Sequence, residues 1–182
     1  MIYITTDTHY NHTEKMHLYC GRPLDYEKRI FKEMSKLTED DVLIHLGDVC
    51  VGKDAEMHKK YIEPLKCKKW LTLGNHDKKS IAWYLRNGWD FVGQSFSLNT
   101  FGKQIIFSHE PLSDKVVNNY DANFFGHFHI HLPRLLKKEW IVEGEEERNR
   151  DVLSYLTPKH HVISLEELNY KLIPLKTLIK QL

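Results

Sequence analysis

The chain of 182 residues is 41% hydrophobic and 28% charged, and its formal net charge at pH 7 is +1. These values exclude a disordered chain and a membrane protein, and they predict one soluble domain over residues 1–182 that buries its own core. The near-neutral charge also argues against a protein that tracks long nucleic acid, because such proteins usually carry a strong basic excess.

The cysteines and the N-terminus indicate a cytoplasmic protein. Three cysteines are an odd number without metal-finger spacing, so we expect free thiols in a reducing compartment. The first ten residues, "MIYITTDTHY", lack the basic, apolar and small-residue regions of a signal peptide. No window approaches the roughly 20 apolar residues that cross a bilayer.

Five short apolar runs predict β-strands, because each is rich in β-branched or aromatic residues and is bounded by Gly, Asp, Asn or Ser. They cover residues 2–4, 42–46, 70–73, 104–107 and 123–125. Helical spacing of apolar residues predicts helices over 24–37, 55–66 and 79–88, with Asp25 capping the first and Gly88 ending the third. Strands that alternate with helices predict an α/β domain.

Three further segments have their own patterns. Residues 91–109 alternate polar and apolar side chains around "NTFGK", which predicts an antiparallel hairpin. Residues 160–175 predict a strand, a short turn and a helical tail. Residues 137–151 mix many charges of both signs, which favours a solvated loop or insertion.

Asp, His or Asn side chains, which can bind metals or transfer protons, follow all five predicted strands. In open α/β sheets ligands bind beyond the carboxyl ends of the strands, so we expect these side chains to meet at one site. Glycine precedes several of them, at sharp exits where a positive φ or a close backbone approach is easiest; the glycines are Gly47, Gly74 and Gly126. The side chains are Asp7, His9, Asp48, Asn75, His76, Asp77, His109, His127 and His129.

These residue types predict a metal centre. Carboxylate oxygen, imidazole nitrogen and amide oxygen together suit Mn²⁺, Fe²⁺ or Zn²⁺. Seven candidate ligands are too many for one catalytic ion, whereas two ions that share a carboxylate fit the number. Such a pair, about 3.5–4 Å apart, polarises a phosphoryl group and makes a hydroxide nucleophile near neutral pH. The seven are Asp7, His9, Asp48, Asn75, His109, His127 and His129.

The ordered motifs "DTH", "GD", "GNHD", "H" and "GHFH" over residues 7–129 resemble those of the calcineurin-like metallophosphoesterases, most of all the compact bacterial and phage members. The resemblance covers about two-thirds of the chain. It implies a four-layer αββα sandwich, two mixed β-sheets flanked by helices, with the metals at one sheet edge. One departure is Glu110–Pro111, where many members have Gly after the matching histidine; this puts the geometry of that loop and access of substrate in doubt.

The resemblance also implies a role for each motif residue. His76 would protonate the leaving oxygen, and Asp77 would orient His76 by a hydrogen bond. Asp48 would bridge the two metals. One metal would be held by Asp7, His9 and His129, and the other by Asn75, His109 and His127.

Other polar residues leave alternatives open. His12 is a candidate for contact with the substrate phosphate, or a solvent-facing loop histidine. Arg22 suits a phosphate oxygen, but a surface arginine is the alternative that we favour. His131 lies beyond the ligand pattern and is expected at the surface or behind the ligands. His45 is expected in the core or on a sheet face.

The sequence therefore predicts a dinuclear metal-dependent phosphoesterase that hydrolyses phosphodiesters or small phosphomonoesters through a metal-bound hydroxide. The two divalent ions are expected to be Mn²⁺, with Fe²⁺ or Zn²⁺ as alternatives. The short chain leaves little room for a cap domain, which favours a diester or nucleotide substrate. The alternative from another class is a non-catalytic metal-binding scaffold of the same fold that binds a protein partner.

Overall fold

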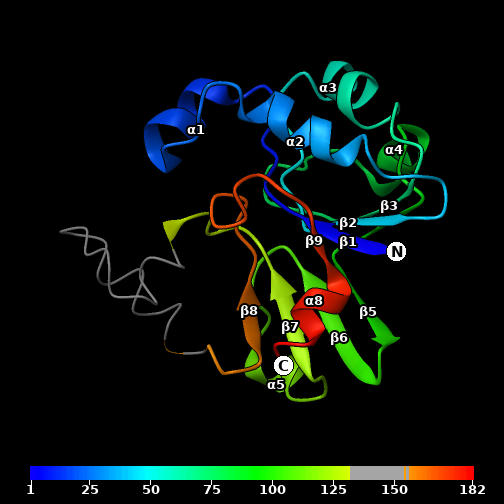
Figure 1. Cartoon of the computed structure of the whole chain (residues 1–182), viewed down its shortest axis with the longest axis vertical. Helices are drawn as coiled ribbons and strands as arrows, with labels where there is room; N and C mark the ends of the chain where they lie inside the picture. The colour runs from blue at the N-terminus through cyan, green and yellow to red at the C-terminus, as the bar shows by residue number, and fades with distance from the viewer. Residues whose placement is uncertain (132–153, 155) are drawn as a thin grey trace.

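The computed structural model describes residues 1–131, 154 and 156–182, and these residues form two mixed β-sheets with helices (Figure 1). The first sheet has the strand order β4-β3-β2-β1-β9, and the second has the order β5-β6-β7-β8. The strands of the first are β1 (Ile2–Thr5), β2 (Val42–His45), β3 (Lys68–Thr72), β4 (Phe91–Gly93) and β9 (Ile173–Pro174). Those of the second are β5 (Ser95–Thr100), β6 (Lys103–Ser108), β7 (Ala122–Phe125) and β8 (His160–Val162).

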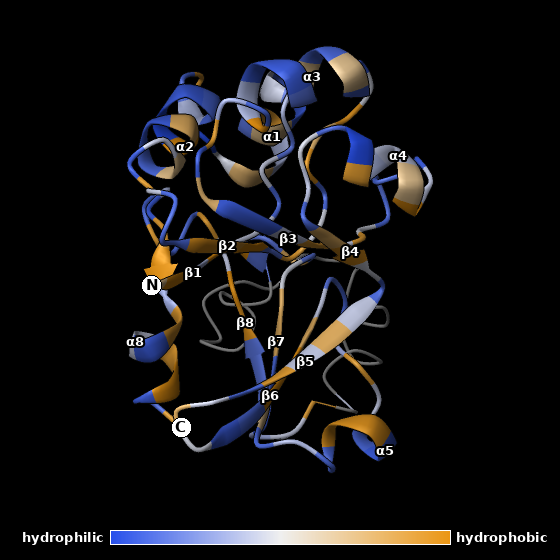
Figure 2. Cartoon of the chain, turned by 90° about the vertical axis from the view of Figure 1, so that its right-hand side faces the viewer, coloured by the Kyte–Doolittle hydropathy of each residue, from blue (hydrophilic) through white to orange (hydrophobic). Residues whose placement is uncertain are grey.

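Helices cover one face of the first sheet, and the second sheet lies against its other face (Figure 2). The covering helices are α1 (Thr13–Cys20), α2 (Tyr26–Met34), α3 (Asp54–Tyr61) and α4 (Ile81–Arg86). Two further helices, α5 (Asp114–Val117) and α8 (Leu175–Ile179), lie beside the second sheet and at the edge of the first, respectively. In the part of the chain that is described, no helix is long and apolar enough to cross a membrane.

Two hydrophobic cores result from this layering. Along β2, Leu43 packs among the residues of the helical layer, whereas Ile44 packs among those between the sheets. A strand that is buried on both faces needs apolar side chains at successive positions, which is why the strands of the first sheet are continuous apolar runs. The inter-sheet core includes Ile4, Ile44, Ile105, Phe107, Phe124 and Leu175.

The outer face of the second sheet contacts Leu112, in the segment that leads from β6 to α5. Asn123 of β7 accepts a hydrogen bond from the backbone nitrogen of Leu112 at 3.0 Å. The ring of His160 on β8 bonds the carbonyl of Leu112 at 2.8 Å. The described residues therefore stack as helices, sheet, sheet and this α5-containing segment, in agreement with the expected αββα class.

Parallel pairing places several strand exits at one end of the sheets. β1, β2 and β3 are mutually parallel, as are β6 and β7. The two sheets are joined at this end, because the backbone nitrogen of His127, after β7, donates to Oδ2 of Asp7, after β1, at 3.0 Å. The convergence expected from the sequence is confirmed.

The structure corrects some predicted elements. The hairpin is confirmed for β5 and β6, but residues 91–93 form β4, which pairs in parallel with β3 in the other sheet. Helix α1 was not predicted. Its apolar residues Leu18 and Tyr19 point to solvent, with exposed fractions of 74% and 60%, so the sequence shows no apolar periodicity that matches the buried face of the helix. The short elements α5 and β9 were not predicted either, because four and two residues are too few to show a periodic apolar pattern. The charged segment 137–151 lies outside the described residues.

Candidate metal centre

The backbone at the strand exits adopts an uncommon conformation. Five of the seven predicted ligands have a positive φ, between 43° and 70°. For a residue with a side chain this costs on the order of 1–3 kcal/mol and persists only where the surroundings enforce it. Here two backbone hydrogen bonds between the loops after β1 and β2 hold the positive-φ conformation. Asp7 N donates to Gly47 O at 2.9 Å, and His9 N donates to Asp48 O at 3.0 Å. The five residues are Asp7, His9, Asp48, His127 and His129.

A first group of ligand atoms gathers around Asp7. Oδ1 of Asp7 lies 3.8 Å from Nε2 of His9 and 4.0 Å from Nε2 of His129. The other oxygen, Oδ2, is occupied by Thr6 Oγ1 at 2.6 Å and His127 N at 3.0 Å. This leaves Oδ1 of Asp7 free to face the two imidazoles.

A second group gathers around Asn75. Its Oδ1 lies 3.0 Å from Nε2 of His109 and 3.0 Å from Nδ1 of His127, and these two nitrogens are 3.1 Å apart. Nδ1 of His109 donates to the carbonyl of Leu46 at 2.8 Å, so Nε2 is the nitrogen that faces Asn75. A ligand histidine is commonly oriented in this way, by a backbone carbonyl on its other nitrogen.

Asp48 lies between the two groups. Its Oδ2 is 3.4 Å from Nε2 of His9 in the first group and 3.4 Å from Nε2 of His109 in the second. Its Oδ1 accepts the backbone N–H of His76 at 2.8 Å. Oδ1 of Asp48 is thus fixed by a hydrogen bond, while Oδ2 faces both ligand groups.

The donor set fits two divalent cations. Oδ1 of Asp7 and Nε2 of His9 are buried and have no hydrogen-bond partner among the described residues, an arrangement that is costly unless something occupies the space between them. Four groups of ligand atoms lie within 4.8 Å of one another in the described residues: Asp7–His9–His129, Asp48–His109–His127, His9–Asp48–His76 and Cys20–His129–Glu166. Oxygen and imidazole nitrogen without thiolate suit Mn²⁺, Fe²⁺ or Zn²⁺.

Charge within the centre sets its protonation. Burial alone would raise the pKa of Asp7, but the neighbouring histidines, His129 foremost, outweigh it and hold that pKa well below the usual range. Burial lowers the pKa of His129 to about 4. Burial would likewise lower the pKa of His109, but the hydrogen bond and charge of Asp48, with the charge of Asp7, raise it to about 9.

His76 stands at the exposed rim of the centre, with its ring centroid 5.2 Å from that of His9. Burial, opposed by the charge of Asp48, lowers the pKa of His76. Asp77 does not contact the His76 ring through any hydrogen bond of the described residues. Its carboxylate instead accepts three backbone N–H groups, from Asp48 at 2.8 Å, Val49 at 3.1 Å and Gly74 at 2.8 Å. Asp77 therefore ties the exits of β2 and β3 together, which argues against the predicted orienting bond.

Arg22 and His131 lie behind the centre and not on its open side. The guanidinium of Arg22 is fully buried and donates to the carbonyl of Asp7 at 2.8 Å, so neither the predicted contact with substrate nor the surface alternative agrees with its position. Nε2 of His131 lies 4.0 Å from Sγ of Cys20, which is itself within 4.8 Å of a ring nitrogen of His129. His45 is buried, as expected, and its Nε2 lies 3.0 Å from Thr8 Oγ1.

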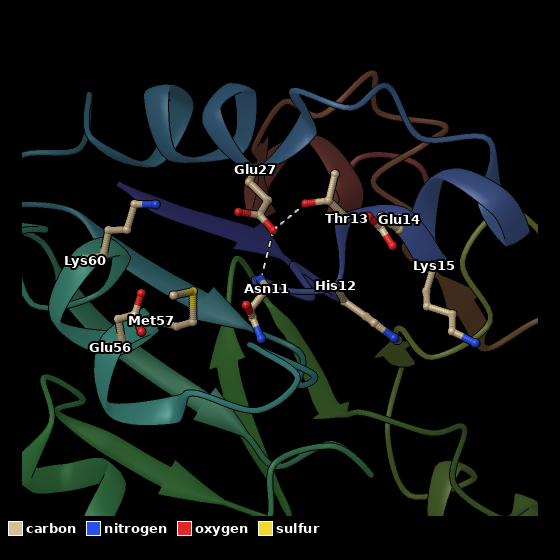
Figure 3. Close-up of a pocket in the computed structure, with 9 residues that line it drawn as sticks. All are labelled: Asn11, His12, Thr13, Glu14, Lys15, Glu27, Glu56, Met57 and Lys60. Atoms are coloured by element: carbon tan, nitrogen blue, oxygen red, sulfur yellow. Dashed lines mark hydrogen bonds between the residues drawn. The ribbon is translucent and has the colours of Figure 1, made fainter.

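Two cavities flank the centre. One, of about 390 Å³, lies among α1, α2 and α3 and has His12 on its wall (Figure 3). The ring of His12 is 6.0 Å from that of His9 and 6.3 Å from that of His76. The other, of about 400 Å³, is lined by Asn75 and His109 together with Glu110 and Pro111, so the loop that departs from the family pattern forms a wall of this cavity.

Some contacts of the site could not be found from the sequence. Tyr26 donates its hydroxyl to the carbonyl of His9 at 2.7 Å, and Glu166 bonds Arg22 at 2.7 Å. Tyr26 lies on the apolar stripe of α2, where an aromatic residue reads as core. Glu166 is 144 positions from Arg22, and nothing local marks it.

Comparison with known proteins supports the fold and identifies the family of the chain. No curated protein matches the sequence. Among solved structures, a protein of unknown function from Aquifex aeolicus is 23% identical, with a TM-score of 0.69 over 100% of this chain and 99% of its own, which supports the fold. A novel archaeal phosphodiesterase is 19% identical, with a TM-score of 0.44 over 69% of this chain and 71% of its own, and is too distant to support an argument. A model of the calcineurin-like phosphoesterase family matches residues 1–172, and the chain belongs to that family.

Proposed function

We propose that the protein is a dinuclear metal-dependent phosphodiesterase. Family membership supports a metal-dependent phosphoesterase. The observation that carries the dinuclear proposal is Asp48, whose Oδ2 lies 3.4 Å from a ligand nitrogen of each group. When bound, the two cations, for which we expect Mn²⁺ before Fe²⁺ or Zn²⁺, would polarise the phosphoryl oxygens and activate water as the nucleophile.

Each metal ligand would come from a loop that directly follows a strand, and the fold already holds the backbone of these loops in place. Asp48 would be a ligand shared by both ions, while its Oδ1 accepts the backbone N–H of His76. Because most of these residues are held in a positive-φ backbone by hydrogen bonds between loops, the ligand atoms need little rearrangement when an ion binds. Asp7, His9 and His129 would hold one ion, and Asn75, His109 and His127 the other.

His76 would donate a proton to the leaving oxygen. Its ring lies at the exposed rim, where a substrate phosphoryl group on the ions would come within its reach. The pKa of this ring is below its usual value in the free protein.

The two cavities favour a diester. In an in-line displacement the entering and leaving oxygens lie on opposite sides of phosphorus. The cavity beside His12 lies on the same side as His76, and therefore would receive the leaving alcohol. The cavity beside His109 would receive the second ester arm, which a monoester lacks. The first cavity has Glu56 and Lys60 on its wall and Met57 as an apolar side chain, a lining that suits a sugar-bearing alcohol such as a nucleoside (Figure 3).

The test compares three chromogenic substrates, p-nitrophenyl phosphate, bis-p-nitrophenyl phosphate and thymidine 5′-monophosphate p-nitrophenyl ester, with metals stripped and with Mn²⁺ restored. We expect Mn²⁺-dependent turnover with kcat/KM higher for both diesters. A preference for the monoester would contradict the diester assignment. No turnover with two ions bound would contradict an enzyme altogether and favour the scaffold alternative.

The cavity assignment has its own control. Glu56→Trp would obstruct the His12 cavity, whereas Lys59→Trp changes an exposed neighbour on α3 that does not line it. We expect KM for substrates to rise in Glu56→Trp and to stay unchanged in Lys59→Trp. Equal effects of the two variants would show that the cavity does not bind substrate.

A further inference from the structure

Three side chains form a buried contact network directly behind the first ligand group. Arg22 and Tyr26 are fully buried, and the side chain of Glu166 is 6% exposed. The guanidinium lies over the Tyr26 ring, with its Cζ 4.9 Å from the ring centroid, and its Nε donates to Oε1 of Glu166 at 2.7 Å. A buried charge pair of this kind is costly to form and is weak evidence for stability, so its contacts need another explanation.

The contacts of this network fall on the ligands of one metal. Arg22 donates from Nη1 to the carbonyl of Asp7 at 2.8 Å, and its Nη2 lies 3.0 Å from Nδ1 of His129. Tyr26 donates its hydroxyl to the carbonyl of His9 at 2.7 Å. All three predicted ligands of the first ion are therefore contacted. Within the described part of the chain, the hydrogen bonds of Arg22, Tyr26 and Glu166 do not reach Asn75, His109 or His127.

These contacts act where the backbone is strained. Asp7, His9 and His129 have φ values of 48°, 43° and 48°. A positive φ in residues with side chains persists only when the surroundings over-determine it. Bonds to the carbonyls of Asp7 and His9 hold these peptide groups in place, and hence direct Oδ1 of Asp7 and Nε2 of His9 toward each other.

Glu166 completes the network on the His129 side. Its Oε2 accepts from Ser164 Oγ at 2.8 Å, and its Oε1 lies 3.8 Å from Nδ1 of His129. With Nδ1 facing the Arg22–Glu166 pair, Nε2 is the nitrogen that faces Asp7. At 3.8 Å, Oε1 of Glu166 is too far from Nδ1 for a hydrogen bond, so Glu166 acts on His129 through Arg22, whose Nη2 lies 3.0 Å from the same nitrogen. The grouping of Cys20, His129 and Glu166 is not a further cation site in this account, because the Arg22 guanidinium already occupies the space beside Glu166 and His129.

We propose that Arg22, Tyr26 and Glu166 are positioning residues for one metal only: they hold Asp7, His9 and His129 in a binding-competent arrangement and leave the second site unaffected. This inference rests on the proposed dinuclear function. It predicts that the two ions of the pair have separable affinities, which can be changed from a region that touches neither substrate nor metal.

The test measures bound metal directly. Stripped wild-type protein, Tyr26→Phe and Glu166→Gln are titrated with Mn²⁺ by isothermal calorimetry, and the ions retained after gel filtration are counted by mass spectrometry. Both changes preserve side-chain shape, and circular dichroism confirms folding of the metal-free forms. Tyr61→Phe is the matched control, because the Tyr61 hydroxyl bonds Glu27 at 3.1 Å and no ligand.

We expect both variants to bind one ion as tightly as the wild type and the other about 10–100-fold more weakly, the range found for residues that orient metal ligands. Tyr61→Phe should bind both ions normally. Two ions bound with wild-type affinity in both variants, or an equal loss at both sites, would overturn the proposal and leave the proposed function intact. A wild-type protein that binds fewer than two ions would remove the proposed function and this inference with it.

Discussion

A Cβ atom placed on Gly74 would lie 2.2 Å from Oδ1 of Asp48 and 2.5 Å from its backbone nitrogen. The exit of β3 therefore passes so close to the exit of β2 that only glycine fits. Asp77 accepts N–H groups from both residues and keeps the two exits in this contact. The position of Asp48 between the two ligand groups thus depends on Gly74, which has no side chain that could bind a metal.

Gly74→Ala should displace Asp48 and weaken both metal sites. Because the nearest atoms belong to a backbone and a buried carboxylate, the clash cannot be relieved cheaply, and we expect the free energy of unfolding to fall by about 1–3 kcal/mol. Urea denaturation and Mn²⁺ titration measure the two effects. Gly102→Ala is the control: its Cβ has no atom within 4 Å, so its positive φ should cost stability without loss of metal. Two ions bound normally by Gly74→Ala would contradict this account.

Asp48→Asn should weaken both ions together, because one oxygen of Asp48 faces a ligand of each. The amide retains an acceptor for the His76 backbone N–H, so the protein should fold, yet the loss of charge between two cations should reduce each affinity more than tenfold. Calorimetry with Mn²⁺ distinguishes this from the selective loss expected for Tyr26→Phe. Full activity with both ions bound would exclude the bridging role.

His76→Ala should lower kcat without loss of metal. The contact with Asp48 is made by the His76 backbone nitrogen, which survives the change, and a proton donor typically contributes about 10²–10⁴-fold to the rate. The loss should be greater for phenyl phosphate than for p-nitrophenyl phosphate, since the poorer leaving group has more need of a proton. Equal losses for the two substrates would assign His76 to binding and not to proton transfer.

Metal affinity should rise with pH between about 6.5 and 8.5, because protons compete for the same nitrogen. The pKa of His109 is raised to about 9 in the metal-free protein, so this ring is protonated at neutral pH and must lose its proton when it binds an ion. Each pH unit below that pKa should weaken binding about tenfold. Calorimetry in buffers of different ionisation enthalpy reports the proton released. No release at pH 7.5 would contradict His109 as a ligand.

The strand exits could be predicted from the sequence because their signal is local. Each apolar run is followed by Gly, Thr or Ser and then a polar residue. Parallel pairing of β1 and β2 brings Asp7 and Asp48 together, and the hydrogen bond from His127 N to Asp7 joins the exit of β7 to them. The glycine pattern is confirmed in the same way at Gly47, where φ is 96° and an added Cβ would lie 2.6 Å from His109.

The parts that the sequence did not predict depend on distant contacts. Arg22 looked like a surface or phosphate-binding residue because its partners, Asp7 and Glu166, are 15 and 144 positions away. The family resemblance implied a hydrogen bond from Asp77 to His76, but the turn after Gly74 directs the Asp77 carboxylate to the amides of Asp48 and Val49. Periodicity and motif order do not contain such relationships, which arise from packing.

If two ions held around Asp48 are needed for phosphodiester hydrolysis, activity should follow the binding of the second ion in a stoichiometric titration. Stripped protein receives Mn²⁺ in fractions of an equivalent while turnover of bis-p-nitrophenyl phosphate and bound metal are measured on the same samples. We predict that activity appears as the second equivalent binds and is constant beyond two. Full activity at one equivalent, or none with two ions bound, would contradict the account.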